Sequence, residues 1–330
     1  MKNIFENKDI LVTGGCGSIG SEIVKQLFRY NPKKIRVFDN NESNLFSIGQ
    51  ELNSKIIRLL IGDIRDRNRV YRATKDADIV FHAAALKHVS LCEYNPFDAV
   101  STNVIGTENL VSSSMDNNVE KFVGISTDKA VNPINTMGAT KLLSEKIIID
   151  TAISSLNTKF CCVRFGNVLD SVGSVIPIFR EQIRKGGPVT ITNKNMARFF
   201  MTKSDAINLV LNATEKTQGG EIFILKMKKL KIIDLAQVLI EELAPKYGHN
   251  PKEIRYEFTG VRYGEKMDES LITEQESSYA EDIGDMYVVR NRWDSSVPVH
   301  ADNHVIRALK DIKFLSIEEI KKVLIEAKIV

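Results

Sequence analysis

An adjacent carboxylate and amine, Asp128-Lys129, follow Thr127 directly at the end of a short apolar run. Neighbouring opposite charges shift one another's pKa, so such a pair can supply both an acid and a base for proton transfer. A threonine hydroxyl beside them can hydrogen-bond a hydroxyl of a substrate. The local alternative is a solvated Asp-Lys turn without chemistry, and the motifs around the pair decide between the two.

A glycine-rich loop, Thr13-Gly-Gly-Cys-Gly-Ser-Ile-Gly20, joins the first apolar run to a helical pattern. Glycines here allow a tight turn, close approach of the backbone to a pyrophosphate, and close packing of the helix on the strand. The N-terminus of the next helix offers unpaired N–H groups to phosphates. The loop predicts a dinucleotide site made by Gly14, Gly17, Ser18, Ile19 and Gly20.

Further residues at the ends of the apolar runs complete the predicted cofactor site. Asp39 ends the second run, where a carboxylate accepts hydrogen bonds from the adenosine ribose and repels a 2′-phosphate, which favours NAD over NADP. The third run ends at Asp63-Ile64, where we expect an adenine contact, although Asp63 could equally be a helix N-cap. Ala83 and Ala84 follow the fourth run, and their small side chains let the backbone pass close to the cofactor.

Met137 and Lys141 lie one turn apart in a helical pattern and therefore share a helix face. Nicotinamide enzymes of the short-chain dehydrogenase/reductase type hold a Tyr and a Lys at this spacing, and the Tyr takes the proton of an alcohol as hydride leaves. A thioether has no exchangeable proton, so Met137 excludes that base. Lys141 keeps its positioning and electrostatic roles. These residues indicate a redox site whose proton transfers are carried by other groups.

The elements that position these motifs alternate between short apolar runs and helical patterns. Most of the runs have too many consecutive apolar residues for a strand with one wet face, so they indicate a parallel sheet covered on both faces. The alternation predicts an α/β fold with an open, doubly wound (Rossmann) sheet. The apolar runs are 9–13, 34–38, 56–61, 78–81, 121–125 and 160–164, and helical patterns include 19–30, 96–115 and 137–153.

The alternation loosens after about residue 164, where glycines and prolines separate shorter elements. We expect residues 1–165 to form an NAD-binding Rossmann domain. Residues 166–330 would be mainly a smaller, mixed α/β substrate-binding part, with an element near 203–213 returning to the first domain. Ser316 with Glu319 predicts a capping box at the start of a last helix.

Composition describes an ordinary globular protein of 330 residues, 43% of them hydrophobic. The net charge of +3 and the lack of a Lys/Arg stripe argue against nucleic acid as a partner. No apolar run reaches the ~18 residues that a membrane span needs, and the N-terminus lacks a signal-peptide pattern. The four cysteines have no metal-ligand spacing, so no metal is expected. A cytoplasmic location follows by default.

Six motifs together carry a resemblance to a known family: Thr13–Gly20, His82–Val89, Glu93–Pro96, Ser126–Pro133, Met137–Lys141 and Arg164–Val168. They resemble the nucleotide-sugar 4,6-dehydratases of the extended short-chain dehydrogenase/reductase superfamily. Within these, the chain is most similar to the UDP-N-acetylglucosamine 4,6-dehydratases of the CapD-like polysaccharide-biosynthesis group. The resemblance runs from about residue 7 to about residue 275.

The resemblance implies a lyase with tightly bound NAD that converts UDP-N-acetylglucosamine to a UDP-4-keto-6-deoxy-N-acetylhexosamine. C4 is oxidised, the C5 hydrogen and C6 hydroxyl are eliminated, and hydride returns to C6. It places Thr127 near the C4 hydroxyl, Asp128 as acid toward the C6 hydroxyl, and Lys129 as base at C5. Lys141 would hold the nicotinamide ribose. Met137 replaces the superfamily Tyr, as in one branch of the group, so the base for the C4 hydroxyl stays open, with Asp128 the first candidate.

Candidate substrate contacts follow from the same resemblance and from chemistry. Three residues just beyond the fourth predicted strand would lie near the sugar, and an Arg fork suits the diphosphate. The candidates are Lys87, His88, Glu93, Asn167, Arg198, Arg262 and Glu265. The family also implies a homo-oligomer, a dimer or larger.

Two other functions compete with the dehydratase. A nucleotide-sugar 4-epimerase needs no acid at C6 and normally keeps the Tyr, so Asp128-Lys129 together with Met137 argue against it. A catalytically silent NAD-binding module would not need Asp128, Lys129 and Lys141 together. The motifs leave open whether the configuration at C5 is retained or inverted.

Overall fold

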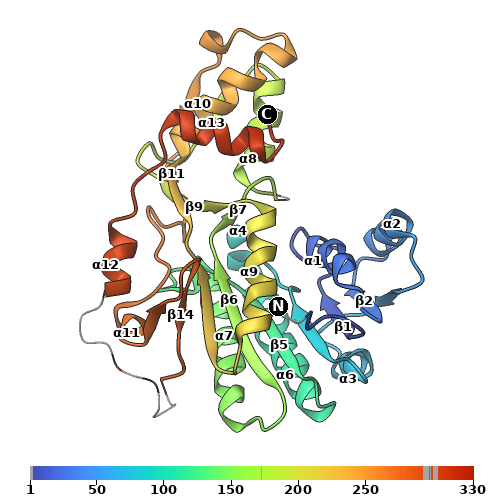
Figure 1. Ribbon diagram of the computed structural model, residues 1–330. Coiled ribbons are helices and arrows are strands. Elements are labelled where there is room, and N and C mark those ends of the chain that lie inside the picture. Colours follow the sequence, from blue (N-terminus) through green and yellow to red (C-terminus); the bar gives the residue numbers. More distant parts are fainter. Residues whose placement is uncertain (1–2, 172, 293–296, 298, 300–303) are drawn as a thin grey trace.

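The computed structural model describes residues 3–171, 173–292, 297, 299 and 304–330. Its described part contains one large sheet flanked by helices and a smaller lobe above it (Figure 1). The large sheet has nine strands in the order β13 (Ala280–Asp282), β14 (Met286–Val289), β10 (Glu221–Leu225), β6 (Lys159–Phe165), β5 (Lys121–Thr127), β4 (Ile79–His82), β1 (Asp9–Thr13), β2 (Lys34–Asp39) and β3 (Ile57–Ile61).

The seven strands from β10 to β3 run parallel, while β14 and β13 extend one edge in antiparallel pairing. The strand order reverses between β1 and β4, which is the point where open α/β sheets bind their ligands. The fold class is therefore the predicted one, a mostly parallel, doubly wound sheet. Its central strands β1, β4, β5 and β6 are mostly apolar because helices cover both faces of the sheet.

Helices cover the sheet as the alternation predicts, and α1 and α9 lie beside each other. They are α1 (Gly20–Leu27), α2 (Glu42–Leu52), α3 (Arg67–Thr74), α4 (Val89–Tyr94), α5 (Pro96–Val100), α6 (Gly106–Asp116), α7 (Thr136–Ser154), α9 (Lys203–Lys216), α11 (Glu274–Ser277) and α12 (His304–Lys310). Since α9 packs on β5, β6 and β10, the segment near 203–213 lies against the large sheet.

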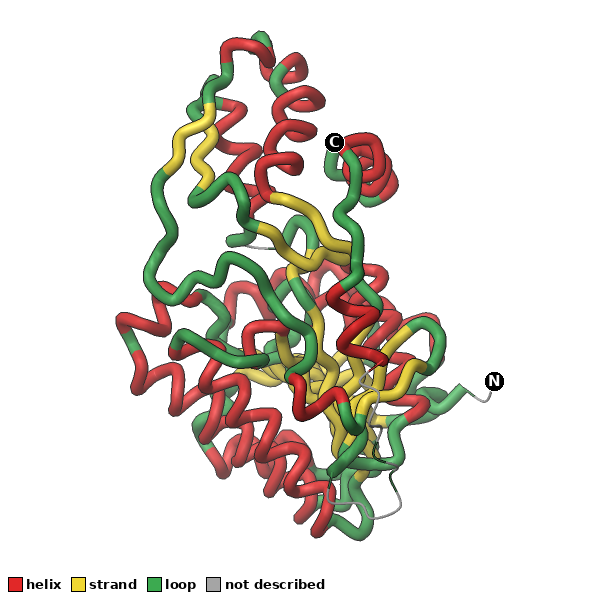
Figure 2. The backbone as a smooth tube through the Cα atoms, turned by 90° about the vertical axis from the view of Figure 1, so that its left-hand side faces the viewer, coloured by secondary structure: helices red, strands yellow, loops and turns green. Residues whose placement is uncertain are grey.

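The smaller lobe stands above the carboxyl edge of the sheet and holds the described C-terminus (Figure 2). It has its own apolar core, in which Ile176, Leu239 and Leu324 are almost completely buried. Its elements are α8 (Val175–Arg184), α10 (Ile232–Leu243), α13 (Ile317–Glu326), and the strands β7 (Asn167–Val168), β8 (Val189–Ile191), β9 (Ala197–Met201), β11 (Lys228–Lys231) and β12 (Tyr256–Phe258). The capping box predicted at Ser316 and Glu319 is confirmed at the start of α13.

The chain after residue 165 thus contributes to both the large sheet and the smaller lobe. β10, β13 and β14 complete the large sheet, while the smaller lobe takes segments before, between and after these strands. The division into residues 1–165 and 166–330 remains a prediction about folding units. It does not coincide with membership of the large sheet, because strands late in the chain pair with early ones.

One local expectation was wrong, and one predicted helix has a feature that its pattern did not predict. The run 56–61 was expected to be covered on both faces, but β3 is the edge strand and Leu59 and Ile61 are 39% and 56% exposed. The helical pattern 96–115 is interrupted by a π-type turn at residues 101–105. In that turn the buried Asn103 side chain accepts from the N–H of Leu86 and donates to its carbonyl. Polar side chains that bond the backbone elsewhere commonly accompany such irregular turns.

Candidate active site

The glycine-rich loop closes tightly against the end of β4. Gly14 has a φ of +62°, and a Cβ there would lie 2.6 Å from the backbone nitrogen of Ala84. A Cβ on Gly20 would lie 2.2 Å from the Gly14 carbonyl oxygen, so α1 can start this close to β1 only with glycine. The loop therefore presents bare backbone and a helix N-terminus, as a pyrophosphate site requires.

This geometry predicts that Gly14→Ala abolishes NAD retention by the purified protein, because the new methyl group would push the loop away from Ala84. Gly248→Ala is the matched control: its φ is +79°, so it pays the same left-handed strain of about 1–2 kcal/mol, yet nothing lies within 4 Å of its Cβ. Bound nucleotide is measured by absorbance after denaturation. Full NAD content in the Gly14 variant would contradict the site.

The carboxylate of Asp39 is fixed at the mouth of this loop. Its two oxygens accept from the backbone N–H groups of Cys16 and Asn41, each at 3.0 Å. Asp63 at the end of β3 is instead gripped by the Arg65 guanidinium, with Nη2 to Oδ2 at 2.7 Å. That hydrogen bond is the main cause that lowers the pKa of Asp63. The alternative of Asp63 as a helix N-cap is wrong.

The N-cap of α3 is Asp66, whose side chain accepts from the N–H of Arg69. Asp63, paired with Arg65, lines a cavity of about 510 Å³ at the switch point between β1 and β4. Predicted residues that line this cavity are Gly14, Gly17, Asp39, Asp63, Ile64, Ala83, Ala84, Lys87 and His88. Ser18 and Ile19 follow Gly17 at the entry to α1, where Ile19 packs on the large core.

Thr127 ends β5, and Asp128 and Lys129 begin a short 3-10 turn at the carboxyl edge of the sheet. The side chain of Asp128 is completely buried. Its Oδ1 accepts from Thr127 Oγ1 and from Lys129 Nζ, each at 2.9 Å, while Oδ2 has no hydrogen-bond partner. Asn167 on β7 also accepts from Lys129 Nζ, at 3.2 Å. The solvated-turn alternative does not describe this buried arrangement.

Met137 and Lys141 lie near the start of α7, beneath this turn. Met137 is buried against Cys92 and Ala99, so the superfamily Tyr position is occupied by core packing. Lys141 is also buried, and its Nζ donates to the carbonyl oxygen of Ile125 at 2.7 Å. Burial is the main cause that lowers the pKa of Lys141. Its predicted contact with a nicotinamide ribose remains a prediction.

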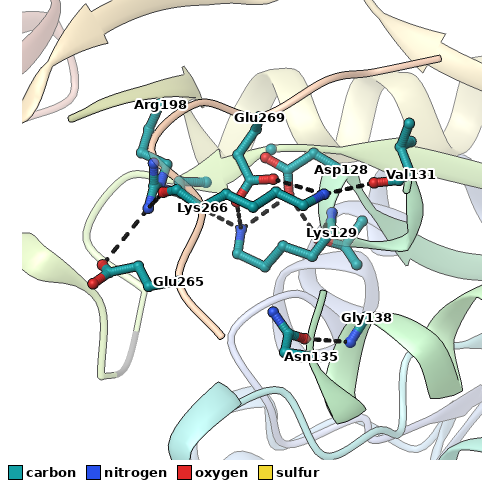
Figure 3. A network of polar contacts seen from close by, with 12 residues as sticks. Asp128, Lys129, Val131, Asn135, Gly138, Arg198, Glu265, Lys266 and Glu269 are labelled. Atoms are coloured by element: carbon teal, nitrogen blue, oxygen red, sulfur yellow. Dashed lines mark hydrogen bonds and ion pairs between the residues drawn. The ribbon is translucent and has the colours of Figure 1, made fainter. Parts of the chain in front are cut away.

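A segment far along the chain, residues 262–269, closes over the Asp128-Lys129 turn (Figure 3). It is held by Asn135, whose Nδ2 donates to the Gly264 carbonyl at 2.7 Å, and by Lys266, whose Nζ donates to the Val131 carbonyl at 2.6 Å. Arg198 on β9 donates to the Lys266 carbonyl at 2.9 Å and lies 3.6 Å from Glu265. The small lobe and the sheet therefore meet at this site.

Glu269 is a residue of this site that sequence reasoning missed. Its side chain is 2% exposed; Oε1 lies 3.9 Å from Lys129 Nζ, and Oε2 lies 3.6 Å from Lys266 Nζ. Burial and then the charge of Asp128 raise the pKa of Glu269. A sequence signal was available, because Glu269 follows two predicted substrate residues, Arg262 and Glu265, by seven and four residues.

The remaining predicted substrate residues are less closely grouped. Lys87 and His88 lie at the cavity, and burial lowers the pKa of both. Glu93 accepts from the N–H of Thr136 at 2.6 Å, so in this structure it fixes the start of α7. Arg262 is exposed, and its own backbone N–H donates to Glu265. Asn167 contacts Lys129 directly and Arg198 contacts the 262–269 segment over the turn, whereas the Arg262 side chain is exposed.

The structure adds two findings on classes of site. Over the residues it describes, no group of three or more His, Cys, Asp or Glu side chains is placed to hold a metal ion. None of the described helices is both long and apolar enough to cross a bilayer.

The fold is that of the extended short-chain dehydrogenase/reductase class. A family model described as polysaccharide biosynthesis protein matches residues 10–291, and the chain belongs to that family. The resemblance found in the sequence is thereby confirmed. The crystal structure of Pen from Bacillus thuringiensis is 40% identical, with a TM-score of 0.90 over 98% of each chain.

Curated relatives carry several names. An uncharacterized membrane protein of Methanocaldococcus jannaschii is 55% identical over 99% of this chain and 98% of its own. A UDP-N-acetylglucosamine 4,6-dehydratase (inverting) of Campylobacter jejuni is 38% identical over 87% of this chain and 84% of its own. CapD of Staphylococcus aureus is 46% identical over 82% of this chain. The matched region covers 46% of CapD, about half of its length. A Rickettsia bellii protein named UDP-glucose 4-epimerase is 40% identical over 86% of this chain and 83% of its own.

Proposed function

We propose that this protein is a hydro-lyase, an NAD-dependent 4,6-dehydratase that acts on UDP-N-acetylglucosamine. The observation that carries the proposal is the buried Asp128 carboxylate with Lys129 Nζ at 2.9 Å, beside Thr127 at the carboxyl end of β5. An acid and a base so placed suit elimination of a proton and a hydroxyl from neighbouring carbons. The similarity to a named dehydratase of Campylobacter jejuni supports the substrate class.

The residues present fit NAD. The bare backbone at Gly14, where a Cβ would strike Ala84, suits a pyrophosphate, and the Asp39 carboxylate at the same mouth suits a ribose without a 2′-phosphate. Lys141 would orient the nicotinamide ribose from α7. When bound, NAD would accept the hydrogen of C4 as hydride and return it to C6.

The chain's own residues would carry the protons. Thr127 orients the C4 hydroxyl, and the unpartnered Oδ2 of Asp128 takes its proton, since Met137 cannot. The ketone at C4 makes the C5 hydrogen acidic, and Lys129 Nζ removes it. Asp128 then gives its proton to the departing C6 hydroxyl, which leaves as water. One carboxyl group can thus serve first as base and then as acid.

The same site could in principle run a 4-epimerase, a reading favoured by the names of the Rickettsia relatives. An epimerase reverses the C4 oxidation and never breaks the C5–H bond. The Asp128-Lys129 pair would then have no elimination to perform. The two functions therefore differ in what happens at C5.

Incubation of the protein with UDP-N-acetylglucosamine in D₂O is expected to give a 4-keto-6-deoxy product that carries deuterium at C5. Lys129 exchanges its protons with the solvent, so the proton that returns to C5 comes from D₂O. Proton NMR and mass spectrometry of the product measure the exchange. A C4 epimer without deuterium at C5 would contradict the dehydratase and establish the epimerase.

A further inference from the structure

The site holds a second buried carboxylate, Glu269, for which the proposed proton transfers above have no use. Its side chain is 2% exposed and comes from the segment after Lys266, which lies close to Lys129 (Figure 3). Its Oε2 accepts no hydrogen bond. Burial and the missing hydrogen bond at this oxygen disfavour the charged carboxylate, although the amines of Lys129 and Lys266, at 3.9 and 3.6 Å, partly offset that cost.

Lys129, in contrast, must lose a proton before it can act as a base. A lysine removes a proton from carbon only through the lone pair of its neutral amine, yet an ordinary lysine, with a pKa of about 10.4, is charged at neutral pH. In this structure Lys129 Nζ contacts Asp128, Asn167 and the more distant Glu269. Some group must receive its proton before the reaction at C5 can start.

We propose that Glu269 is the positioning residue that receives the ammonium proton of Lys129 and so converts Lys129 to a neutral base. The inference rests on the proposed dehydratase function. One N–H bond of Lys129 breaks, one O–H bond forms on Glu269 Oε1, and no electrons are gained or lost. The two atoms are 3.9 Å apart, and the flexible lysine side chain, still 21% exposed, can close that gap.

Asp128 is a poorer acceptor although it is nearer. Its Oδ1 is already stabilised by hydrogen bonds from Thr127 and Lys129, and its other oxygen has to collect the proton of the C4 hydroxyl. If Asp128 also held the lysine proton, it could not act on that hydroxyl. With a separate acceptor for the lysine proton, Asp128 can start the cycle as a carboxylate and Lys129 as a neutral amine.

The charges around Glu269 fit this transfer. The groups that face it are Asp128 and Lys129 in the turn after β5, Lys266 in its own segment, and Arg198 on β9. Moving one proton from Lys129 to Glu269 leaves the net charge of this cluster unchanged. It replaces a buried ion pair by a neutral pair, and the exclusion of water by a bound substrate favours the neutral pair. Burial and the charge of Asp128, which raise the pKa of Glu269, act in the same direction.

The test is the pH dependence of kcat in the NAD-loaded protein with UDP-N-acetylglucosamine. An internal transfer does not depend on pH, so the wild-type kcat should be flat from neutrality to near the ordinary pKa of lysine. In Glu269→Gln the lysine must lose its proton to water. The kcat should then be about 10²-fold lower at neutral pH and rise about tenfold per pH unit, with KM little changed.

Two further variants separate this role from packing. Glu269→Asp keeps an acid and should restore the flat profile at a reduced kcat. Asp268→Asn makes the same carboxylate-to-amide change one residue earlier, on a side chain that is 55% exposed and pairs with Lys229, and should match the wild type. A kcat for Glu269→Gln that is unchanged, or lowered equally at every pH, would overturn the proposal, as would rising profiles in both Glu269 variants. If the wild type forms no dehydrated product, the proposed function itself fails and the role of Glu269 falls with it.

Discussion

Lys129→Ala is expected to lower kcat for dehydration by about 10²–10⁴-fold while the purified protein keeps its NAD. The Lys129 amine lies close to both Asp128 and Glu269. Its removal takes away the proposed base for the C5 proton. Among the described residues, the hydrogen bonds of Lys129 go to Asp128 and Asn167, and Asp39 is bonded to the glycine-rich loop instead. Cofactor binding should therefore be retained in the variant. Product formation by NMR and bound nucleotide by absorbance give the two measurements.

Lys185→Ala is the control for the loss of a lysine charge, because Lys185 pairs with Glu181 on the surface of α8 and its side chain is 67% exposed. It should show wild-type turnover. The Lys129 variant should also stop incorporation of deuterium at C5. Dehydration within a fewfold of wild type would mean that another group removes the C5 proton.

The second large effect is expected in stability, from Arg164→Met. Arg164 is completely buried in β6 and forms two-pronged hydrogen bonds with Glu145 of α7, at 3.0 and 2.7 Å, and with Glu276 of α11, at 3.1 and 3.0 Å. Burial opposes its charge, but the two carboxylates raise the pKa of Arg164 above its usual value. Removal of the arginine would leave the buried Glu145 carboxylate without its ion-pair partner, and Glu276 with only the Thr273 N–H, which costs about 3–5 kcal/mol.

Chemical denaturation followed by circular dichroism measures this loss in the free energy of unfolding. Arg184→Met is the matched control, since Arg184 forms the same kind of pair with Glu181 but on an exposed surface. Its unfolding midpoint should stay near that of the wild type, because exposed ion pairs contribute little. A loss below about 1 kcal/mol for Arg164→Met would show that the carboxylates find water or take up protons at little cost.

The Arg164 contacts also concern the site. Arg164 donates to the carbonyl oxygen of Leu271 at 2.9 Å, so it anchors the chain just after Glu269 to the strand next to β5. An arginine at the end of an apolar run gave no sign of this in the sequence. Its partners lie on elements far apart in the chain, and only packing brings them together.

Local patterns were enough to predict the cofactor half of the fold. Apolar runs and glycines act over a few residues, so the strands from β1 to β6, the loop before α1 and the end of β5 were predicted close to their observed bounds. The exceptions depend on the tertiary surroundings of a segment. β3 lies at an edge, and Asn103 interrupts a helix by bonding to Leu86.

The sequence by itself determined which chemistry is available: an acid–amine pair at a strand end, a methionine where a tyrosine would be expected, and a bare loop for a dinucleotide. Residue type and short spacing decide these. Only the tertiary structure decided what surrounds the pair. It buried Asp128 and brought Glu269 to Lys129 from a segment far along the chain. The environment that sets the proton affinity of a side chain comes from long-range packing, which no local pattern contains.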